Sequence, residues 1–446
     1  KRFVIIEAGT GVGKSAVGLT LCRYLEQAIP NQEGFAQGGY FLTTQKILQA
    51  QYEKDFGKSR GVMKSIYSSS NYQCKFHRGN DCRTSQQMLM TADRKSAFFK
   101  ACAGTCKYKN AKRAFLESPE SVTNFPYFLT EATYSGGITP RKILVIDEAH
   151  NTESVLSNFV EVSVSQYFCE KVVKCKWPDK ITPVNFVKWI ENVYFPKLQS
   201  QIMHFENQIE QLGLKDRIKE LSSVALKYDM MTGHSGKLEK FLKDYDKDNW
   251  VMEKEETEKR GYQYESISIP SPFPVENRPI INVSVGSMSA RAIDSTLPQL
   301  KEAVKAIMQE HGSEKGIVHC HTYKIANYLK KNIRGKLGKR ILIHDSRNRD
   351  AILKQHMSSK EPTVLLSPSM TEGIDLKGDL SRFQVICKVP YPWLGDPIVK
   401  KRMHKFPNWY SLKTAMTIVQ AVGRSVRNSE DTAITYILDS DWSRFY

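Results

Sequence analysis

The chain opens on an apolar run, residues 3–6 (FVII), that leads directly into a glycine-rich segment. A short continuous apolar run of this kind is typical of a buried strand. Residues 16–25 then have helical spacing, while residues 38–44 (GGYFLTT) and 142–147 (KILVID) predict two further strands. Strands that alternate with helices predict a parallel sheet of the α/β class.

The same alternation returns from Gly316 onward. Short apolar runs are separated there by longer helical segments, and the runs read GIVHCH, KRILIHD, TVLLSP, FQVICKVP and TAITYILD. This pattern predicts a second α/β domain.

Between these parts, residues 185–242 have helical spacing, with Pro196 as the expected break near the start. Their apolar positions are spaced by 4, 3, 4 and 3 residues, which is an a/d seam over about two heptads; they are Leu198, Ile202, Phe205, Ile209 and Leu212. The seam favours a helical hairpin that stands off the sheet. Helices that simply cover the sheet are the alternative.

Basic residues outnumber acidic residues by 18 among the 446 residues. This excess favours a polyanionic partner, nucleic acid first and an acidic membrane surface second, although solubilising surface charge produces the same excess. No apolar run reaches 18 residues, and residues 3–6 are too short for the core of a signal peptide. An odd number of cysteines, nine, favours a reducing compartment. We therefore expect an intracellular protein, either cytoplasmic and nucleoid-associated or nuclear.

Residues 7–15 (EAGTGVGKS) form a candidate phosphate loop between the first strand and the first helix. Ala8 stands where the pattern G-x-x-x-x-G-K-[ST] has its first glycine, so the match is not strict. The glycines would aim backbone N–H groups at phosphate, Lys14 would neutralise β- and γ-phosphate charge, and Ser15 would ligate Mg²⁺. A flexible glycine loop is the alternative. The predicted nucleotide-binding residues here are Ala8, Gly9, Thr10, Gly11, Val12, Gly13, Lys14 and Ser15.

The strand at 142–147 leads into DEAH, residues 147–150. Asp147 would hold Mg²⁺, directly or through water, and Glu148 would polarise the attacking water. Together with the phosphate loop, this tetrapeptide predicts ATP hydrolysis, with catalytic roles for Lys14, Asp147 and Glu148.

The stretch QAVGRSVR places Gln420, Arg424 and Arg427 at i, i+4 and i+7, which is one face of a helix. Guanidinium groups presented in this way suit a γ-phosphate, so we predict that these residues are catalytic. Surface arginines on an ordinary helix are the alternative. Upstream, residues 369–375 (SMTEGID) predict a loop that senses both nucleotide and polymer. Its predicted nucleotide contacts are Glu372, Gly373 and Asp375.

Four of the nine cysteines fall within one 33-residue window, with the spacing C-x7-C-x19-C-x3-C. They are Cys74, Cys82, Cys102 and Cys106. Four thiolates suit a [4Fe–4S] cluster and also suit tetrahedral zinc, for which only the second pair has the usual short spacing. From spacing alone, a cluster, zinc and unligated thiols all remain open.

Hydroxyl groups near strand ends and aromatic side chains are the usual contacts of motors that track a nucleic-acid backbone. The candidates of this kind are Thr43, Thr44, His321, Thr322, Tyr323, Tyr391 and Trp393. Each of them has an ordinary structural role as its alternative.

Taken in order, these blocks resemble the motifs of superfamily 2 helicases, and three further stretches narrow the resemblance to the XPD/DinG-type iron–sulfur DNA helicases. The stretches are CKYKNAKRAF with NFPYFL (106–129), SPFPVENRPI (271–280) and KVPYPWLGDPIVKKRM (388–403). With the phosphate loop, DEAH, TEGIDLKGD and QAVGRSVR they span nearly the whole chain.

The resemblance implies two RecA-like motor domains, with an iron–sulfur insertion and a helical arch insertion in the first. We accordingly expect motor domain 1 at 1–66 and 116–164, the cluster domain at 67–115, the arch at 165–262 and motor domain 2 at 263–446. It also implies a [4Fe–4S] cluster on the four cysteines, ATP and Mg²⁺ as cofactors, and 5′→3′ translocation on single-stranded DNA. The expected substrates are single strands and forked or tailed duplexes, acted on by a monomeric motor with a role such as DNA repair.

One departure concerns the family's third motif, a Ser-Ala-Thr element that should end a strand before SPFP. Only YQYESISIP precedes Ser271, and residues 287–290 (SMSA) follow SPFP instead. We therefore expect further natural residues near Ile269–Pro270, as well as before Lys1.

Two rival functions remain at this point. An RNA helicase or remodeller would share DEAH, but the cysteine region and the VPYP block argue against it. A non-catalytic DNA-binding scaffold would not need Lys14, Asp147, Glu148, Arg424 and Arg427.

Overall fold

The computed structural model describes residues 3–9, 12–30, 33–57, 62–76, 81–90, 92–179, 181–214, 218–245, 264–271, 273–345, 348–368, 376, 378–423, 425–426 and 430–444. The chain divides into two compact units, which are described separately here. The central unit is Ser15–Tyr262, and the C-terminal unit combines Lys1–Lys14 with Gln263–Tyr446.

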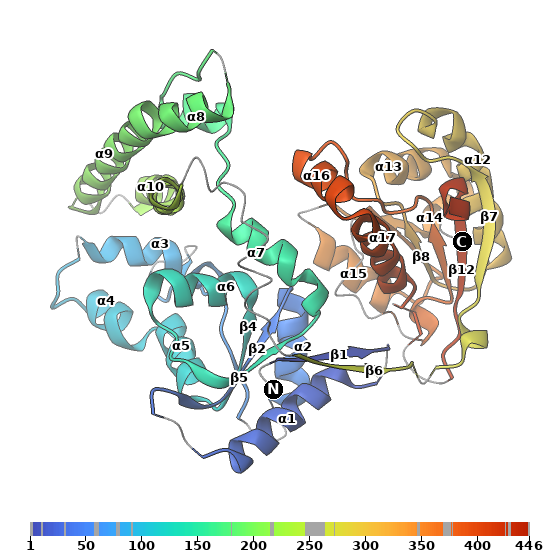
Figure 1. The fold of residues 1–446 in the computed structure, drawn as a ribbon, viewed down its shortest axis with the longest axis horizontal. Coiled ribbons are helices and arrows are strands. Elements are labelled where there is room, and N and C mark those ends of the chain that lie inside the picture. The colour runs from blue at the N-terminus through green and yellow to red at the C-terminus, as the bar shows by residue number, and fades with distance from the viewer. Residues whose placement is uncertain are drawn as a thin grey trace. The chain divides into compact units, whose positions relative to one another are not determined.

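The central unit contains a four-stranded parallel sheet with the order β3-β4-β2-β5 (Figure 1). Its strands are β2 (Ala36–Thr43), β3 (Lys64–Ser65), β4 (Glu120–Asn124) and β5 (Arg141–Ile146). The helices that belong with it are α1 (Lys14–Ala28), α2 (Lys46–Phe56), α3 (Cys82–Gln87), α4 (Ala97–Lys100), α5 (Lys107–Glu117), α6 (Phe125–Thr130) and α7 (Thr152–Val160).

Helices cover both faces of this sheet. Successive side chains of a strand point to opposite faces, so neighbouring residues of β2 pack in different cores. Phe41 of β2 packs in one core with residues of α1 and α2, whereas its neighbour Tyr40 packs with residues of α5 and α6. The buried Arg141 guanidinium lies 4.1 Å from the centroid of the Tyr40 ring and donates to the Leu116 carbonyl at 2.9 Å. The sheet is therefore a two-faced α/β layer, as predicted from the alternation of strands and helices.

The rest of the central unit is a helical segment with α8 (Pro183–Trp189), α9 (Phe195–Leu214) and α10 (Ile218–Asp244). The predicted seam is on α9: Leu198 and Ile202 are buried in one core with Met231 and Leu238 of α10. Pro196 lies in the first turn of α9, where proline lacks only a hydrogen bond that the helix could not make. The helical hairpin is thus present.

The hairpin is fastened to the cysteine-containing segment. The carboxylate of Asp229 on α10 forms an ion pair with Arg83 and accepts a hydrogen bond from Gln87 at 2.5 Å, both on α3. Met88, which follows α3, packs with Ile209 of α9 in a small apolar cluster. A charged contact and an apolar contact therefore join the two segments.

The C-terminal unit contains a six-stranded parallel sheet with the order β7-β12-β11-β8-β10-β9. Its strands are β7 (Ile280–Gly286), β8 (Gly316–His319), β9 (Ile341–Ile343), β10 (Val364–Ser367), β11 (Phe383–Ile386) and β12 (Ile434–Asp439). Its helices are α12 (Ile293–Glu310), α13 (Tyr323–Asn332), α14 (Gly335–Arg340), α15 (Arg349–Ser358), α16 (Pro397–Lys405) and α17 (Pro407–Val422).

Both faces of this sheet are also covered. Val318 of β8 packs with residues of α12 and α13, while its neighbour Ile317 packs with residues of α15. Ile418 of α17 packs on Ile386 and Ile437 of neighbouring strands. All five strands predicted after Gly316 are confirmed.

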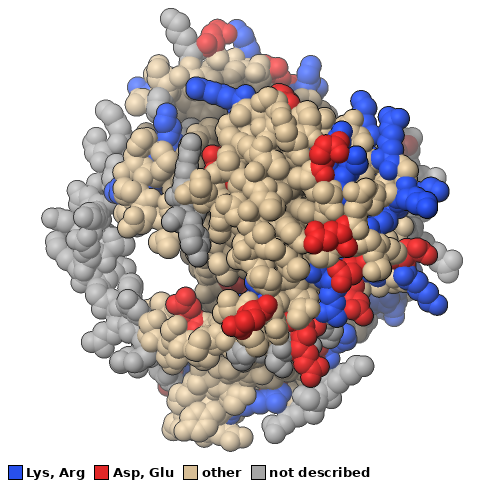
Figure 2. All heavy atoms as spheres, turned by 90° about the vertical axis from the view of Figure 1, so that its right-hand side faces the viewer, with Lys and Arg blue, Asp and Glu red and all other residues tan. Residues whose placement is uncertain are grey.

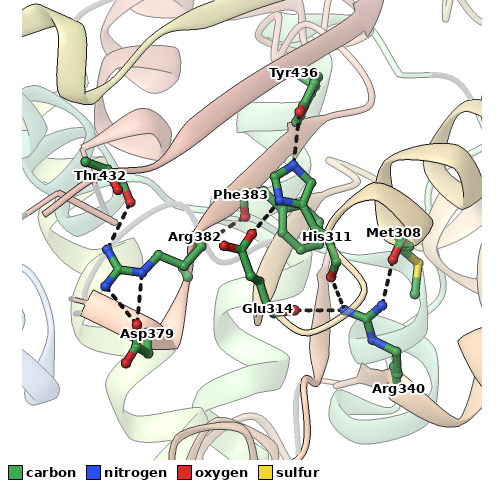
Figure 3. A network of polar contacts seen from close by, with 10 residues as sticks. Met308, His311, Glu314, Arg340, Asp379, Arg382, Phe383, Thr432 and Tyr436 are labelled. Atoms are coloured by element: carbon green, nitrogen blue, oxygen red, sulfur yellow. Dashed lines mark hydrogen bonds and ion pairs between the residues drawn. The ribbon is translucent and has the colours of Figure 1, made fainter.

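The edge at which the strands of this sheet begin is held by a polar network (Figure 3). The Arg340 guanidinium donates to the carbonyls of Met308, His311, Glu314 and Pro362 at 2.6 to 2.9 Å. Beside it, the His311 ring contacts the Tyr436 hydroxyl at 3.0 Å and stacks on the Phe383 ring, whose centroid lies 4.5 Å away.

The opening strand differs from its prediction. β1 (Phe3–Ala8) pairs in parallel with β6 (Tyr264–Ile269) in a separate two-stranded sheet. Phe3, Val4 and Ile5 are each about half exposed, because β1 has a strand on one side only. The prediction of a buried strand is therefore wrong for β1. The strand before SPFP is present as β6, and the expectation of further residues near Ile269–Pro270 stays a prediction.

Charge is unevenly distributed over the face that Figure 2 shows, where lysine and arginine side chains gather mainly along one side of a broad uncharged area. Among the described residues, no helix has the length and apolar character needed to cross a membrane.

Candidate functional site

The described part of the phosphate loop lies between β1 and the start of α1. Gly13 has a φ of 73°, a left-handed conformation that favours glycine, and Gly9 approaches Ser271 so closely that a Cβ would lie 2.5 Å from its Cα. The Lys14 ammonium donates to the carbonyls of Ala8 and Gly9 at 3.1 and 3.2 Å. Two carbonyls of the loop therefore hold the Lys14 ammonium close to the backbone. Of the predicted residues, Thr10 and Gly11 lie outside the described residues.

The two residues predicted to hold magnesium, Ser15 and Asp147, both lie next to the Tyr52 hydroxyl. Tyr52, on α2, is 3% exposed, and its pKa is raised, chiefly by burial and then by the charge of Asp147. Ser15 hydrogen-bonds the same hydroxyl. The Asp147 N–H donates to the Leu42 carbonyl of β2 at 3.0 Å, which fixes the carboxylate at the end of the sheet. A hydroxyl and a carboxylate, oxygen ligands of the kind that Mg²⁺ prefers, are therefore brought together.

Sequence reasoning missed Tyr52. Its segment shows only helical spacing, which also accounts for a buried aromatic residue in the core, so no local signal could have marked it.

Glu148 follows in a strained backbone conformation, with a φ of 54°. Its carboxylate lies 3.3 Å from His150 Nδ1. Left-handed backbone in a residue other than glycine is costly and is concentrated at functional sites. The geometry is therefore consistent with the predicted role of Glu148.

The predicted arginine arrangement lies only partly within the described residues. Gln420 lies on α17, which ends at Val422. Arg424 and Arg427 lie outside the described residues, and so do the coupling-loop residues Glu372, Gly373 and Asp375.

The four clustered cysteines line one cavity of about 170 Å³. An isolated antiparallel bridge between Gln73 and Asp81 brings Cys74 and Cys82 together. The Cys106 sulfur caps α5 by accepting a hydrogen bond from the Lys109 N–H at 3.4 Å. The cavity is several times the roughly 30 Å³ that a water molecule occupies in the liquid, so it has room for an inorganic group.

The charges of neighbouring thiolates affect the pKa values of the clustered cysteines. Burial raises the pKa of Cys82 to about 12, with further increases from Cys106 and Cys102, and burial with Cys106 raises the pKa of Cys102 to about 11. Among the described residues, no three His, Cys, Asp or Glu side chains form a metal-binding group. The donor set and the cavity therefore fit a thiolate-bound metal group, whereas the present side-chain positions do not form a ligand shell.

The two threonines predicted to contact DNA lie where β2 ends, beside Asp147. Thr43 is fully buried and donates to the Gln45 carbonyl at 3.2 Å, which is a structural contact. The Thr44 hydroxyl is buried and has no hydrogen-bond partner among the described residues.

The candidates after β8 lie where the strands of the second sheet end. His321 has a φ of 57°, and burial together with the charge of Lys388 lowers its pKa. Thr322 caps α13 by accepting a hydrogen bond from Ile325 N–H at 3.3 Å. Tyr323 is 44% exposed and is available for stacking.

The two aromatic candidates after β11 differ from each other. Tyr391 stacks on Tyr410, with ring centroids 5.6 Å apart and planes 7° from parallel. Trp393 is 77% exposed. The structure thus uses Tyr391 for packing and presents Trp393 to solvent.

Known protein families match both parts of the chain. Residues 302–444 match the helicase C-terminal domain, and residues 1–173 match the res subunit of type III restriction enzymes.

Curated relatives are distant. The ATP-dependent DNA helicase YoaA of Escherichia coli is 23% identical over 186 residues, which is 40% of this chain and 29% of the relative. The ATP-dependent DNA helicase DinG of Photobacterium profundum is 24% identical over 191 residues, which is 39% of this chain and 27% of the relative. The matches thus span less than a third of the length of these relatives.

Solved structures share the fold across nearly the whole chain. An XPD helicase structure aligns with a TM-score of 0.60 and 15% identity, over 99% of this chain and 93% of its own. Xpd4 of S. tokodaii aligns with a TM-score of 0.54 and 13% identity, with the same coverage. Both parallel sheets accordingly belong to RecA-like domains, and the predicted α/β fold class is confirmed. In sequence and in fold, the chain thus resembles the XPD/DinG-type family of superfamily 2 helicases.

Proposed function

We propose that this chain is the motor of an ATP-dependent DNA helicase. The observation that carries the proposal is the meeting of Ser15 and Asp147 at the Tyr52 hydroxyl. These residues come from the two motifs that nucleotide-hydrolysing motors use to hold Mg²⁺.

The residues have distinct roles in this proposal. Incoming phosphate oxygens replace the carbonyls of Ala8 and Gly9 as partners of the Lys14 ammonium, which neutralises the developing charge. Ser15 and Asp147 hold magnesium, and Glu148 orients the attacking water. Arg424 and Arg427 stabilise charge on the γ-phosphate, with Gln420 beside them and residues 369–375 coupling nucleotide to DNA.

Lys14→Ala tests the catalytic assignment. ATP turnover in the presence of single-stranded DNA should fall by at least about 100-fold, because a donor aimed at developing charge is worth about 3 kcal/mol or more. Lys197→Ala, which removes an exposed lysine of α9, is the matched control and should leave turnover unchanged. Intact turnover in Lys14→Ala would exclude this chain as the ATPase.

We propose DNA as the polymer along which the protein moves. The relatives are DNA helicases by name, and the chain carries an excess of 18 basic residues. Thr44, Tyr323 and Trp393 are the predicted contacts with groups available for binding, while Thr43, Thr322 and Tyr391 act as structural supports around them. The proposed action is 5′→3′ translocation by a monomer on single strands, with unwinding of forked or tailed duplexes, inside the cell.

The cysteine cavity is proposed to hold a [4Fe–4S] cluster, with zinc as the alternative. A cluster bound by Cys74, Cys82, Cys102 and Cys106 would supply a rigid cross-link for the segment, because it ties four points of the chain together. We propose residues 67–115 as this domain, 165–262 as the arch, and 1–66 with 116–164 and 263–446 as the two motors.

Metal analysis separates these alternatives. Protein purified without oxygen should contain about four iron atoms per chain and a broad visible absorbance that Cys102→Ser abolishes. One zinc per chain without colour would establish the alternative, and neither metal would remove the cluster from the proposal.

An RNA motor is the rival that shares the nucleotide site. Stimulation of ATP turnover by poly(U) at the level reached by poly(dT) would favour it, whereas selective stimulation by poly(dT) supports the DNA assignment.

A further inference from the structure

A long stretch near the end of the chain carries no negative charge. Residues 397–429 contain no aspartate or glutamate, although the chain average of 47 acidic residues in 446 would place three or four there. The same stretch contains seven lysines and arginines. Its basic residues are concentrated on α16, which lies just beyond the strand ends of the second sheet.

Three lysines and one histidine of α16 lie on one side of the helix and face solvent, whereas Arg402 lies outside this face and over the Trp409 ring. Lys400, Lys401, His404 and Lys405 are all exposed, and their positions fall within an arc of about 140° at 100° per residue. No ion pair forms to the three lysines within the part of the chain that the structure describes. Elsewhere in this unit exposed lysines do find carboxylates, as Lys324 does with Asp294 at 2.5 Å.

This arrangement costs stability in the free protein. Lys401 and Lys405 are an i, i+4 pair of like charge, which destabilises a helix by about 0.2–0.5 kcal/mol. The helix dipole favours cations in the last turn, which accounts for Lys405 but not for Lys400 and Lys401 nearer the start. A polyanion that binds along the helix would remove the repulsion.

The loop before α16 presents an aromatic platform. Trp393 is 77% exposed, and its indole lies so close to Gly395 that a Cβ on Gly395 would come within 2.2 Å of the ring. The indole therefore lies against the backbone at Gly395, while most of the ring is exposed to solvent. Asp396 then begins α16 by accepting a hydrogen bond from the Ile398 N–H at 2.8 Å, so the platform and the basic face are joined by a fixed turn.

We propose that α16 is a phosphate-binding site for single-stranded DNA, and that it continues the strand from the base stacked on Trp393. Lys400, Lys401 and Lys405 contact successive phosphates. A single strand is favoured over a duplex because its bases are free to stack on an exposed indole. The inference rests on the proposed function, which supplies DNA as the polymer bound, and it adds the lysines of α16 to the predicted DNA contacts.

The test compares two triple variants that lose the same charge. K400A/K401A/K405A removes the proposed site, and K331A/K336A/K339A removes three exposed lysines of α13 and α14 in the same unit. Binding of fluorescein-labelled dT20 is measured by anisotropy between about 50 and 200 mM NaCl, beside binding of a 20-base-pair duplex.

Each phosphate contact on a single strand contributes about 0.7 to the slope of log affinity against log salt. The α16 variant should therefore lose about 2 from this slope and on the order of 100-fold in dT20 affinity at 100 mM salt. The control variant should lose less than about 0.5 from the slope. A K400R/K401R/K405R variant, which keeps the charge, should restore the wild-type slope and exclude misfolding as the cause.

Three results would overturn the inference. Equal slopes for the two alanine variants would show that only net charge matters, and a change confined to the duplex would place double-stranded DNA on α16. Wild-type protein that does not bind dT20 would reject the proposed function itself, so the two failures are distinguishable.

Discussion

The two edges of the sheet in the C-terminal unit use their cations in opposite ways. At the edge where strands begin, the Arg340 guanidinium donates to four carbonyls. Arg382 pairs with Asp379 there at 2.7 Å (Figure 3). At the edge where strands end, the lysines of α16 have no carboxylate partner among the described residues. The strained backbone of His321 and the exposed indole of Trp393 lie at this second edge as well.

The difference indicates that one edge of the sheet stabilises the fold and the other is suited to bind a ligand. Ligands of open parallel sheets bind beyond the carboxyl ends of the strands, where the connecting loops are free to vary. A cation with satisfied partners holds the fold, whereas a cation held without partners stays available for a ligand. Two substitutions and a change of pH test this comparison, and a third substitution tests the nucleotide site of the central unit.

The largest effect is expected from Arg340→Met at the first edge. Four carbonyls would lose a charged donor, so the free energy of unfolding should fall by about 3 kcal/mol. Urea unfolding followed by circular dichroism measures it. Arg334→Met is the control, since among the described residues the exposed Arg334 guanidinium donates only to the Lys331 carbonyl, at 3.3 Å. Equal stability of the two variants would show that the network is not what holds this edge.

Trp393→Ala at the second edge should leave stability unchanged and weaken DNA binding. An exposed ring contributes little to folding, so the melting temperature should hold, while the affinity for dT20 should fall by about 2 kcal/mol, or roughly 30-fold, through lost stacking. Anisotropy and thermal melting measure the two quantities. A large loss of stability with unchanged affinity would make Trp393 a packing residue.

Acidification should act on both edges. Burial lowers the pKa values of His321, His344 and His356. Below about pH 6.5 the unfolded chain therefore binds more protons than the folded chain, so stability is complete above this pH and is lost as pH falls. The loss is at most about 1.4 kcal/mol per pH unit for each histidine. Melting curves between pH 7.5 and 5.5 measure it, and His356→Gln should reduce the slope; a rise in melting temperature on acidification would contradict the assignment.

The smallest effect is expected from Tyr52→Phe in the central unit. Loss of the hydroxyl that positions Ser15 and Asp147 should raise the Mg²⁺ concentration for half-maximal ATP turnover about fivefold, which corresponds to about 1 kcal/mol. A magnesium titration at saturating ATP measures it. Tyr67→Phe, which removes a hydroxyl outside this site, is the control and should not change the magnesium dependence.

Local patterns predicted a large part of this molecule. Apolar runs located β2, β5 and the strands after Gly316, and the spacing on α9 predicted the helical seam. The same reasoning failed where the outcome depends on neighbours in space. β1 has a buried-strand sequence but, among the described strands, a partner on one side only.

The site was predicted to a similar extent. The phosphate loop and DEAH mark Ser15 and Asp147, because their chemistry is local to each motif. Tyr52 and the carbonyls around Arg340 carry no local signal, since they are defined only by chain segments that meet on folding. The basic face of α16 is visible in the sequence as a stretch without acids, but its exposure is not.

The central claim is that ATP turnover by this chain unwinds DNA, and strand displacement tests it most directly. A labelled duplex with a 5′ single-stranded tail, one with a 3′ tail and a blunt duplex are incubated with the protein, ATP and Mg²⁺, beside Lys14→Ala. The account predicts displacement from the 5′-tailed duplex alone, and none with Lys14→Ala. Displacement from the 3′-tailed duplex alone would contradict the proposed polarity, and displacement from no duplex would contradict the helicase assignment.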